Sequence, residues 1–173
     1  MKFLIQSFAV LSLVFLFASC GGELETVDKP EDIGPQVFAV LEDMDEMTKA
    51  QFRQHFLTIE DIHVLAKDES LGMSKEMSDF FLAQDKEEYD KDLNDDFKKI
   101  DKKGKKLGIE WTQIEYVRFT SKIRIKGEIK QCDGEMTFKY KKTPFVVETR
   151  SLYDGTGWSL LKIGKPKKSL LIN

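Results

Sequence analysis

Apolar residues recur at two spacings along the chain, and the change falls near Gly108. Before it, spacings of three and four residues indicate amphipathic helices, and after it apolar and polar residues alternate as in half-buried strands. Within 35–67, Thr48 and Thr58 each stand three residues before a Gln or Asp, which is the spacing of a capping box. We therefore predict three short helices there, the first opened by Pro35.

Helical spacing resumes at Ser74, a residue type typical of N-caps, and continues to about Lys103. This pattern predicts one long helix, which Gly104 ends while Gly108 completes the turn. The sequence Lys102-Lys103-Gly104-Lys105-Lys106 forms a basic cluster at that end. It is either a solvated helix terminus or a surface that contacts anionic lipid headgroups.

The second half of the chain predicts an antiparallel sheet of about five strands, one of them with a wet basic face. Asp133-Gly134 is a strong hairpin signal, and Asp154 to Gly157 predicts a second turn. The expected strands cover 109–119, 123–130, 135–140, 145–153 and 158–163. Helices followed by a meandering sheet indicate the class α+β, with N-terminal helices packed on a curved sheet in one domain from 35 to 163.

The first 22 residues carry a separate signal. Lys2, an apolar run from Phe3 to Phe17 and two small residues are the three parts of a secretory signal peptide. The run is also shorter than the roughly 20 residues of a spanning helix. Phe17-Ala18-Ser19-Cys20 resembles the lipobox of bacterial lipoproteins, although position 17 is commonly Leu in that family. The resemblance implies cleavage between Ser19 and Cys20 and acyl chains on Cys20, and two or more chains anchor a protein stably. A cleaved signal without lipid and a retained membrane helix are the alternatives.

Processing at this site defines the remaining parts of the chain. Removing residues 1–19 from the 173 leaves 154, a length suited to one domain. Residues 20–34 are predicted to be the lipidated cysteine and a flexible acidic tether, and 164–173 a C-terminal tail. Cys132 is then the only unmodified cysteine, so no intramolecular disulfide is available. It lies in a predicted turn, either as a small strand-end residue or as a reactive thiol.

Charge is distributed unevenly along the chain, whose formal net charge is −3. Residues 23–101 carry 23 acids and 9 bases, whereas residues 102–173 carry 7 acids and 17 bases. Such asymmetry can steer a partner toward the protein. The alternative is that acidic helices pack beside a basic sheet and neutralise it. Nucleic acid is not an expected partner, because an exported lipoprotein rarely meets it.

The order of elements resembles the cone-shaped α+β superfamily that includes nuclear transport factor 2 and ketosteroid isomerase. The local likeness is the turn at Thr156-Gly157 before Trp158, followed by Leu160 and Ile163. The resemblance spans 35–163 and implies a curved sheet around N-terminal helices with a pocket between them. A cystatin-like or lipocalin-related arrangement is the alternative.

In that superfamily, enzymes use carboxylate, Tyr or His groups that face the pocket, so the resemblance gives Trp111, Glu115 and Tyr140 as pocket candidates. Glu115 is a candidate general base if burial raises its pKa. Alternatively, the aromatic residues fill the core and Glu115 pairs with a neighbouring base. His55 and His63 lack the spacing of a metalloprotease site, which favours solvated or core-edge histidines over metal ligands. No cofactor motif is present, so no cofactor is predicted.

These observations predict a lipid-anchored protein of the bacterial cell envelope, with the outer membrane favoured over the inner one. Its domain is expected to bind a small apolar ligand or an envelope protein without catalysis. One alternative is an isomerase or dehydratase built on the same cone. The other is a protein-interaction lipoprotein that acts as an inhibitor or assembly partner.

Overall fold

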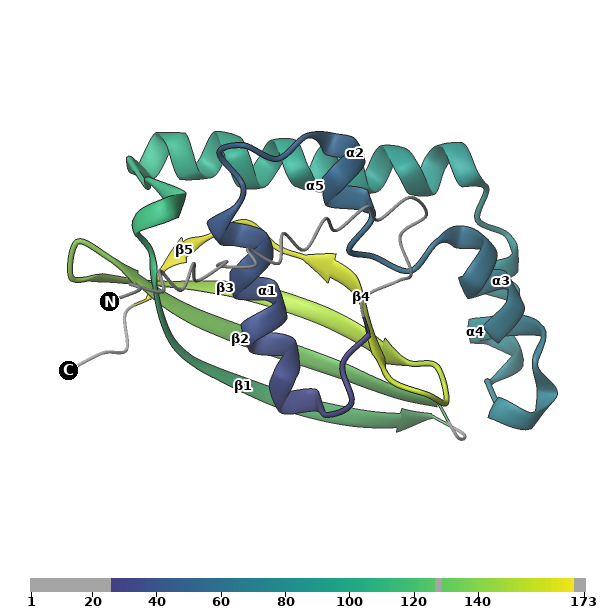
Figure 1. The fold of residues 1–173 in the computed structure, drawn as a ribbon. Helices are drawn as coiled ribbons and strands as arrows, with labels where there is room; N and C mark the ends of the chain where they lie inside the picture. Colours follow the sequence, from purple (N-terminus) through teal and green to yellow (C-terminus); the bar gives the residue numbers. More distant parts are fainter. Residues whose placement is uncertain (1–25, 127–128, 170–173) are drawn as a thin grey trace, which may run out of the picture.

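The predicted α+β class is confirmed by a computed structural model that describes residues 26–126 and 129–169 (Figure 1). Helices come first, and a five-stranded antiparallel sheet follows. The predicted signal peptide and the predicted cleavage and lipid-attachment site, Ser19 and Cys20, lie outside the described residues.

Two capping boxes set the starts of the short helices, as predicted. The hydroxyls of Thr48 and Thr58 accept hydrogen bonds from the backbone N–H groups of Gln51 and Asp61, whose side chains accept from the threonine N–H groups. The helical segments are η1 (Pro30–Asp32), α1 (Ile33–Glu42), α2 (Lys49–Arg53), α3 (Ile59–Lys67), η2 (Glu69–Leu71), α4 (Lys75–Leu82), α5 (Lys86–Leu107) and η3 (Trp111–Gln113).

The single long helix predicted from Ser74 to Lys103 begins where expected, but its continuity and its C-terminal end are wrong. Ser74 does cap a helix, but α4 ends at Leu82 and Asp85 begins a new one by accepting a hydrogen bond from the Glu88 N–H at 2.8 Å. At the other end, α5 runs through Gly104 and stops at Leu107. Gly108 then supplies the left-handed conformation (φ 66°) of the C-cap.

The sheet has the order β1-β2-β3-β4, and the short β5 pairs with β3 beside β4. Adjacent strands are antiparallel throughout. In Figure 1, α1 crosses one face of this sheet, while α3 and α4 stand at one end of it. The strands are β1 (Glu115–Lys126), β2 (Ile129–Tyr140), β3 (Thr143–Tyr153), β4 (Trp158–Ile163) and β5 (Lys167–Lys168).

The predicted hairpin at Asp133-Gly134 is wrong, because both residues lie inside β2. Gly134 pairs with Ser121 of β1 on one side and with Thr149 of β3 on the other. A Cβ on Gly134 would lie 2.3 Å from Cζ of Phe119, so the glycine provides room for this ring rather than a turn. Of the two strands predicted at 109–119 and 123–130, residues 115–126 form one strand, β1, whereas 111–113 form η3 and 129–130 begin β2.

Two apolar clusters hold the layers together. The larger one lies between the helices and the sheet and is filled by large side chains that are at most 2 % exposed, among them Phe52, Phe56, Trp111, Phe138 and Phe145. The smaller one joins Leu57, Ile59 and Ile62, from α3 and the residues just before it, to Ile129 of β2 and Leu152 of β3.

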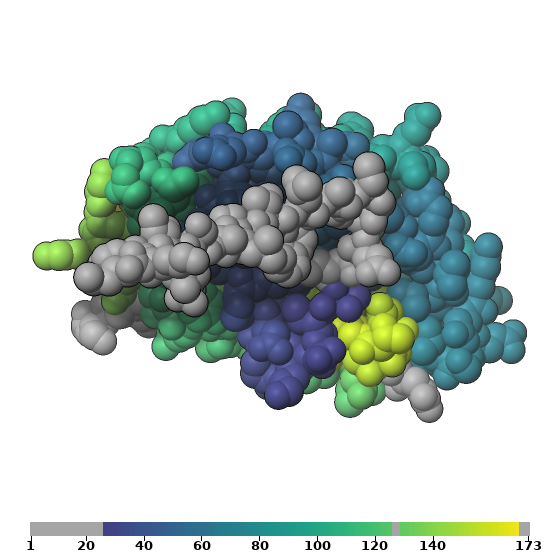
Figure 2. All heavy atoms as spheres, in the orientation of Figure 1, coloured from purple at the N-terminus to yellow at the C-terminus, as the bar shows by residue number. Residues whose placement is uncertain are grey.

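The folded part extends beyond the predicted range of 35–163 in both directions. Val27 and Trp158 exchange backbone hydrogen bonds of 3.0 and 2.8 Å, and Ile33, at the start of α1, is fully buried. Figure 2 shows this N-terminal segment in purple against the yellow turn that follows β3. At the C-terminus, Lys167 and Lys168 form β5.

Candidate functional site

The three pocket candidates do not form a pocket between the sheet and the helices. Trp111 lies in η3 and is 1 % exposed, and its backbone N–H donates to Asp45 at 3.1 Å. Tyr140 is also buried and donates its hydroxyl to Glu110 at 2.8 Å. Glu115 is exposed at the start of β1, opposite Lys139. The two aromatic residues therefore belong to the core, and Glu115 belongs to the surface.

The other candidate side chains are also separated. His63 contacts the Gln84 carbonyl oxygen at 3.1 Å, and among the described residues no cluster of three or more metal-ligating side chains is found. Cys132 is buried on β2 rather than placed in a turn, and burial raises the pKa of its thiol. Of the predicted basic cluster, Lys105 pairs with Asp101 within α5 at 2.9 Å.

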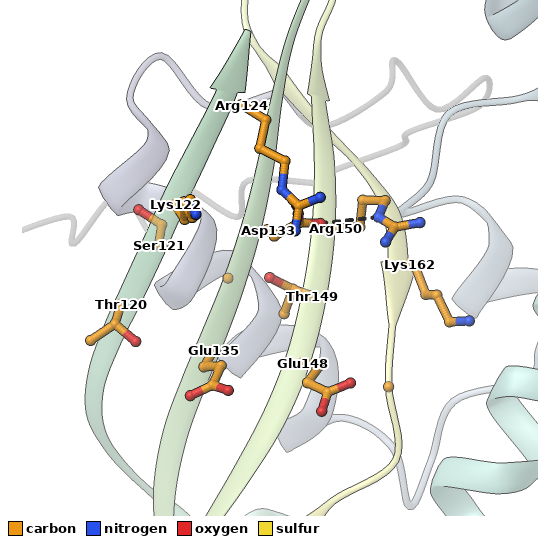
Figure 3. Close-up of a pocket in the computed structure, with 12 residues that line it drawn as sticks. Thr120, Ser121, Lys122, Arg124, Asp133, Glu135, Glu148, Thr149, Arg150 and Lys162 are labelled. Carbon is orange, nitrogen blue, oxygen red and sulfur yellow. Dashed lines mark hydrogen bonds and ion pairs between the residues drawn. The ribbon is translucent and has the colours of Figure 1, made fainter. Parts of the chain in front are cut away.

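A polar groove of about 540 Å³ lies on the other face of the sheet, opposite α1 (Figure 3). We call it the outer groove. Strand alternation places its charged side chains on one face of four adjacent strands. The second apolar cluster bounds it, because Ile129 and Leu152 lie on this same face and are covered by Ile59 and Ile62 of α3. The charged lining consists of Lys122, Arg124, Asp133, Glu135, Glu148, Arg150 and Lys162.

Asp133 is the centre of the outer groove. Arg124 from β1 places Nε 2.8 Å from its Oδ2, and Arg150 from β3 donates from Nε to its Oδ1 at 3.1 Å. Gln131 donates to Oδ1 as well, at 3.0 Å. Burial alone would raise the pKa of Asp133. The hydrogen bonds from Arg150 and Gln131 and the two guanidinium charges outweigh burial and hold the pKa below its usual range.

The far part of the groove is acidic. Glu135 of β2 lies directly opposite Glu148 of β3, a like-charge pair that costs stability in a sheet. Glu148 is paired with Lys167 at 2.6 Å. The side chains of Glu135 and Lys122, by contrast, have no hydrogen-bond or ion-pair partner in the part of the chain that the structure describes. The groove thus has a cationic part around Asp133 and an acidic part around Glu135.

A second groove, of about 620 Å³, lies among α2, α3 and α5. Several of its polar groups are already paired with one another: Lys86 with Glu60 at 2.6 Å, and Arg53 with Asn94 at 2.8 Å. The Tyr89 hydroxyl donates to the Leu57 carbonyl oxygen at 2.9 Å. Of the charged residues that line this groove, Asp90 alone has no side-chain partner within the described ranges, whereas the outer groove keeps Lys122, Glu135 and exposed guanidinium donors. The outer groove is therefore the stronger candidate for binding.

The sequence had indicated part of this surface. The basic wet face of the strand near residue 124 is confirmed, since Lys122 and Arg124 are exposed. On the other face of β1, however, the predicted burial is wrong, because Ile123 and Ile125 are 44 % and 66 % exposed. Asp133 was assigned to a turn. The alternation of Gln131, Asp133 and Glu135 along one face was the signal that could have placed it in a strand.

Comparisons with protein-family models, with curated proteins and with solved structures give no match for this chain. The lipoprotein anchor and the cone superfamily therefore stay predictions from the sequence. Within the described ranges, no helix combines the length and the apolar character that crossing a membrane requires.

Proposed function

We propose that this chain is a lipid-anchored protein of the bacterial cell envelope whose domain binds a ligand through the outer groove. The observation that carries the binding role is the arrangement around Asp133: two arginines from different strands converge on one carboxylate and leave further guanidinium donors exposed. The lipobox-like segment ending at Cys20 carries the anchor.

A binding role fits the ionisation of the groove better than a catalytic one. A general base works best when its pKa lies near the working pH. Asp133 has a pKa below its usual range, so it is a weak base near neutral pH. The isomerase-type alternative needed Glu115 in a water-excluded pocket, and Glu115 is exposed. The interior that an apolar ligand would occupy is filled by aromatic side chains.

The anchor would keep this domain close to the membrane. From Cys20 to Thr26, the first described residue, a fully extended chain spans at most about 21 Å. Val27 is already fixed to Trp158. An acylated Cys20 would therefore hold the β4 end of the sheet near the lipid headgroups. The outer groove would then bind its ligand close to the membrane surface.

Mass spectrometry of the chain purified from its envelope fraction tests both parts. Under denaturing conditions, we expect a chain that begins at Cys20 and carries the mass of a diacylglycerol and an acyl group, and a C20S variant lacks it. Under native conditions, we expect an added mass that denaturation removes. An unacylated chain would overturn the anchor.

The groove assignment needs its own variant. Thr120 lies on the groove lining, and T120W places a large ring there, so we expect it to abolish the native added mass. Thr112, which is exposed on η3, gives the matched control T112W, which should keep the added mass. Retention of the ligand by T120W, or its absence from the unmodified chain, would overturn the groove as the binding surface.

A further inference from the structure

Resting on the proposed binding role of the outer groove, we infer that it recognises a zwitterionic ligand. Arg124 and Arg150 bind its carboxylate or phosphate group, and Glu135 binds its ammonium group. Both halves of this inference come from charged groups whose positions the sheet fixes.

The cationic half is held in place by Asp133. Arg150 donates from Nε to Oδ1, and Nε of Arg124 forms an ion pair with Oδ2 without a hydrogen bond. A guanidinium has five N–H donors in a planar fork, so the Nη donors of both side chains remain for another acceptor. No other partner of either arginine lies in ranges 26–126 and 129–169. Carboxylates and phosphates match this fork with two parallel hydrogen bonds.

The positive charge of this region exceeds what Asp133 neutralises. Lys122 lies opposite Asp133 in the strand register but forms no ion pair with another described residue, and Lys162 pairs with Asp96 at 4.0 Å. Four cationic side chains therefore line the groove together with Asp133, and two of them, Arg124 and Arg150, pair with it. In Figure 3, Arg124 and Arg150 are drawn on either side of Asp133, and Lys162 lies beyond them.

The acidic half limits which anions fit. Glu135 is two residues from Asp133 on β2, so the two side chains leave the same face of the strand from Cα atoms about 7 Å apart. Glu135 also faces Glu148, and it has no cation partner in the described part of the chain. Glu148 is already paired with Lys167, but a simple dianion would be repelled by the uncompensated Glu135, whereas an ammonium group on the same ligand would be attracted to it. The ligand is therefore expected to carry both charges.

Calorimetric titration with O-phosphoethanolamine and with glycerol 3-phosphate tests the inference, because both carry a phosphate and only the first carries an amine. A chain that begins at Gly21 is suitable, since both apolar clusters lie between Ile33 and Ile163. We expect saturable binding of phosphoethanolamine at least tenfold tighter than that of glycerol phosphate. E135Q should reduce this preference to less than twofold.

The arginines are tested with a matched pair of double variants. R124Q/R150Q removes two ion-paired cations from the groove, and K98Q/K105Q removes two ion-paired cations from α5. The first should weaken phosphoethanolamine binding at least tenfold, and the second less than twofold. R124K/R150K keeps the charge but removes the fork, so it should also lose binding while thermal unfolding shows that it folds.

Equal losses in both glutamine double variants would show long-range attraction only and overturn the inference. So would the absence of saturable binding by phosphoethanolamine. If the native ligand is lost in T120W but kept in R124Q/R150Q, the proposed binding role stands and the anion site is wrong. Arginine-dependent binding to phosphatidylethanolamine vesicles would assign the ligand to a lipid headgroup, and binding of the soluble probe alone would assign it to a soluble compound.

Discussion

At the scale of single residues, Asp133 joins the fold to the proposed site. It ties β1 and β3 together through Arg124 and Arg150, and its side chain is only 23 % exposed. Hydrogen bonds to a charged group contribute more than neutral ones, about 1.5–3 kcal/mol each before solvent screening. The same contacts that orient the arginines for a ligand are therefore expected to stabilise the sheet.

This dual role gives a pH-dependent prediction for D133N. Because the folded-state pKa of Asp133 lies below the unfolded value of about 3.9, its stabilisation is present above that value and is lost as the pH falls through the folded pKa. We expect D133N to lower the free energy of unfolding by about 1–2 kcal/mol at pH 7. In urea unfolding, the difference from the unmodified chain should narrow below about pH 4.

Glu135 provides the control, since it faces Glu148 and has no cation partner among the described residues. E135Q removes one of two opposed charges and should leave stability unchanged or slightly raised. A D133N difference that stays constant from pH 7 into acid would contradict the ion-pair explanation.

At the scale of elements, the glycines show where sequence patterns fail. Gly104 was predicted to end a helix, and Gly134 was predicted to form a hairpin turn. Each glycine in fact lies inside a helix or a strand. Glycine fits at these positions because an aromatic ring packs closely on it: Trp111 on Gly104 and Phe119 on Gly134. A sequence pattern reports local backbone preference, whereas these close approaches depend on tertiary contacts.

The local signals that did succeed are those whose partners lie a few residues away. Both threonine capping boxes and the change from helix to strand spacing are of this kind. The outer groove is not, because Arg124, Asp133 and Arg150 meet only once the register of three strands is fixed. The sequence thus predicts the class and several boundaries of the fold, but not the convergence that makes the candidate site.

The close packing at Gly104 can be tested by whether a Gly to Ala substitution raises or lowers the free energy of unfolding. A Gly to Ala change inside an exposed helix normally stabilises by up to about 1 kcal/mol. In G104A, however, the new Cβ would lie 2.5 Å from Cζ2 of Trp111. We expect a loss of about 1–3 kcal/mol in urea unfolding because the buried ring has to move. K102A, on an exposed position of the same helix, should change stability by less than about 0.5 kcal/mol. A stabilised G104A would contradict the close packing.

At the scale of the whole molecule, the acidic and basic halves are joined mainly by apolar packing. Among the ion pairs between described residues, Lys162 with Asp96, at 4.0 Å, is the one that links an acidic helix to the basic sheet. Mutual neutralisation by direct pairing is therefore limited. The excess positive charge of the sheet remains on its outer face, where the groove lies.

The N-terminal boundary of the folded domain also depends on contacts across the whole molecule. The sequence predicted a tether up to residue 34, since 20–34 contain few apolar residues. Yet Ile33 is fully buried and Val27 pairs with Trp158, so the segment is expected to be part of the cooperative unit. Deleting a buried Ile side chain typically costs about 2–5 kcal/mol.

Two truncated chains test this boundary. A chain that begins at Thr26 keeps every described contact and should unfold at the same urea concentration as one that begins at Gly21. A chain that begins at Pro35 lacks Ile33 and Val27, and its free energy of unfolding should fall by at least about 2 kcal/mol. Under conditions in which this shortened chain is fully folded, it should still bind phosphoethanolamine, because the outer groove lies on the opposite face of the sheet from α1. Equal stability of the two truncated chains would instead make residues 26–34 a tether, and the domain would then stand farther from the membrane.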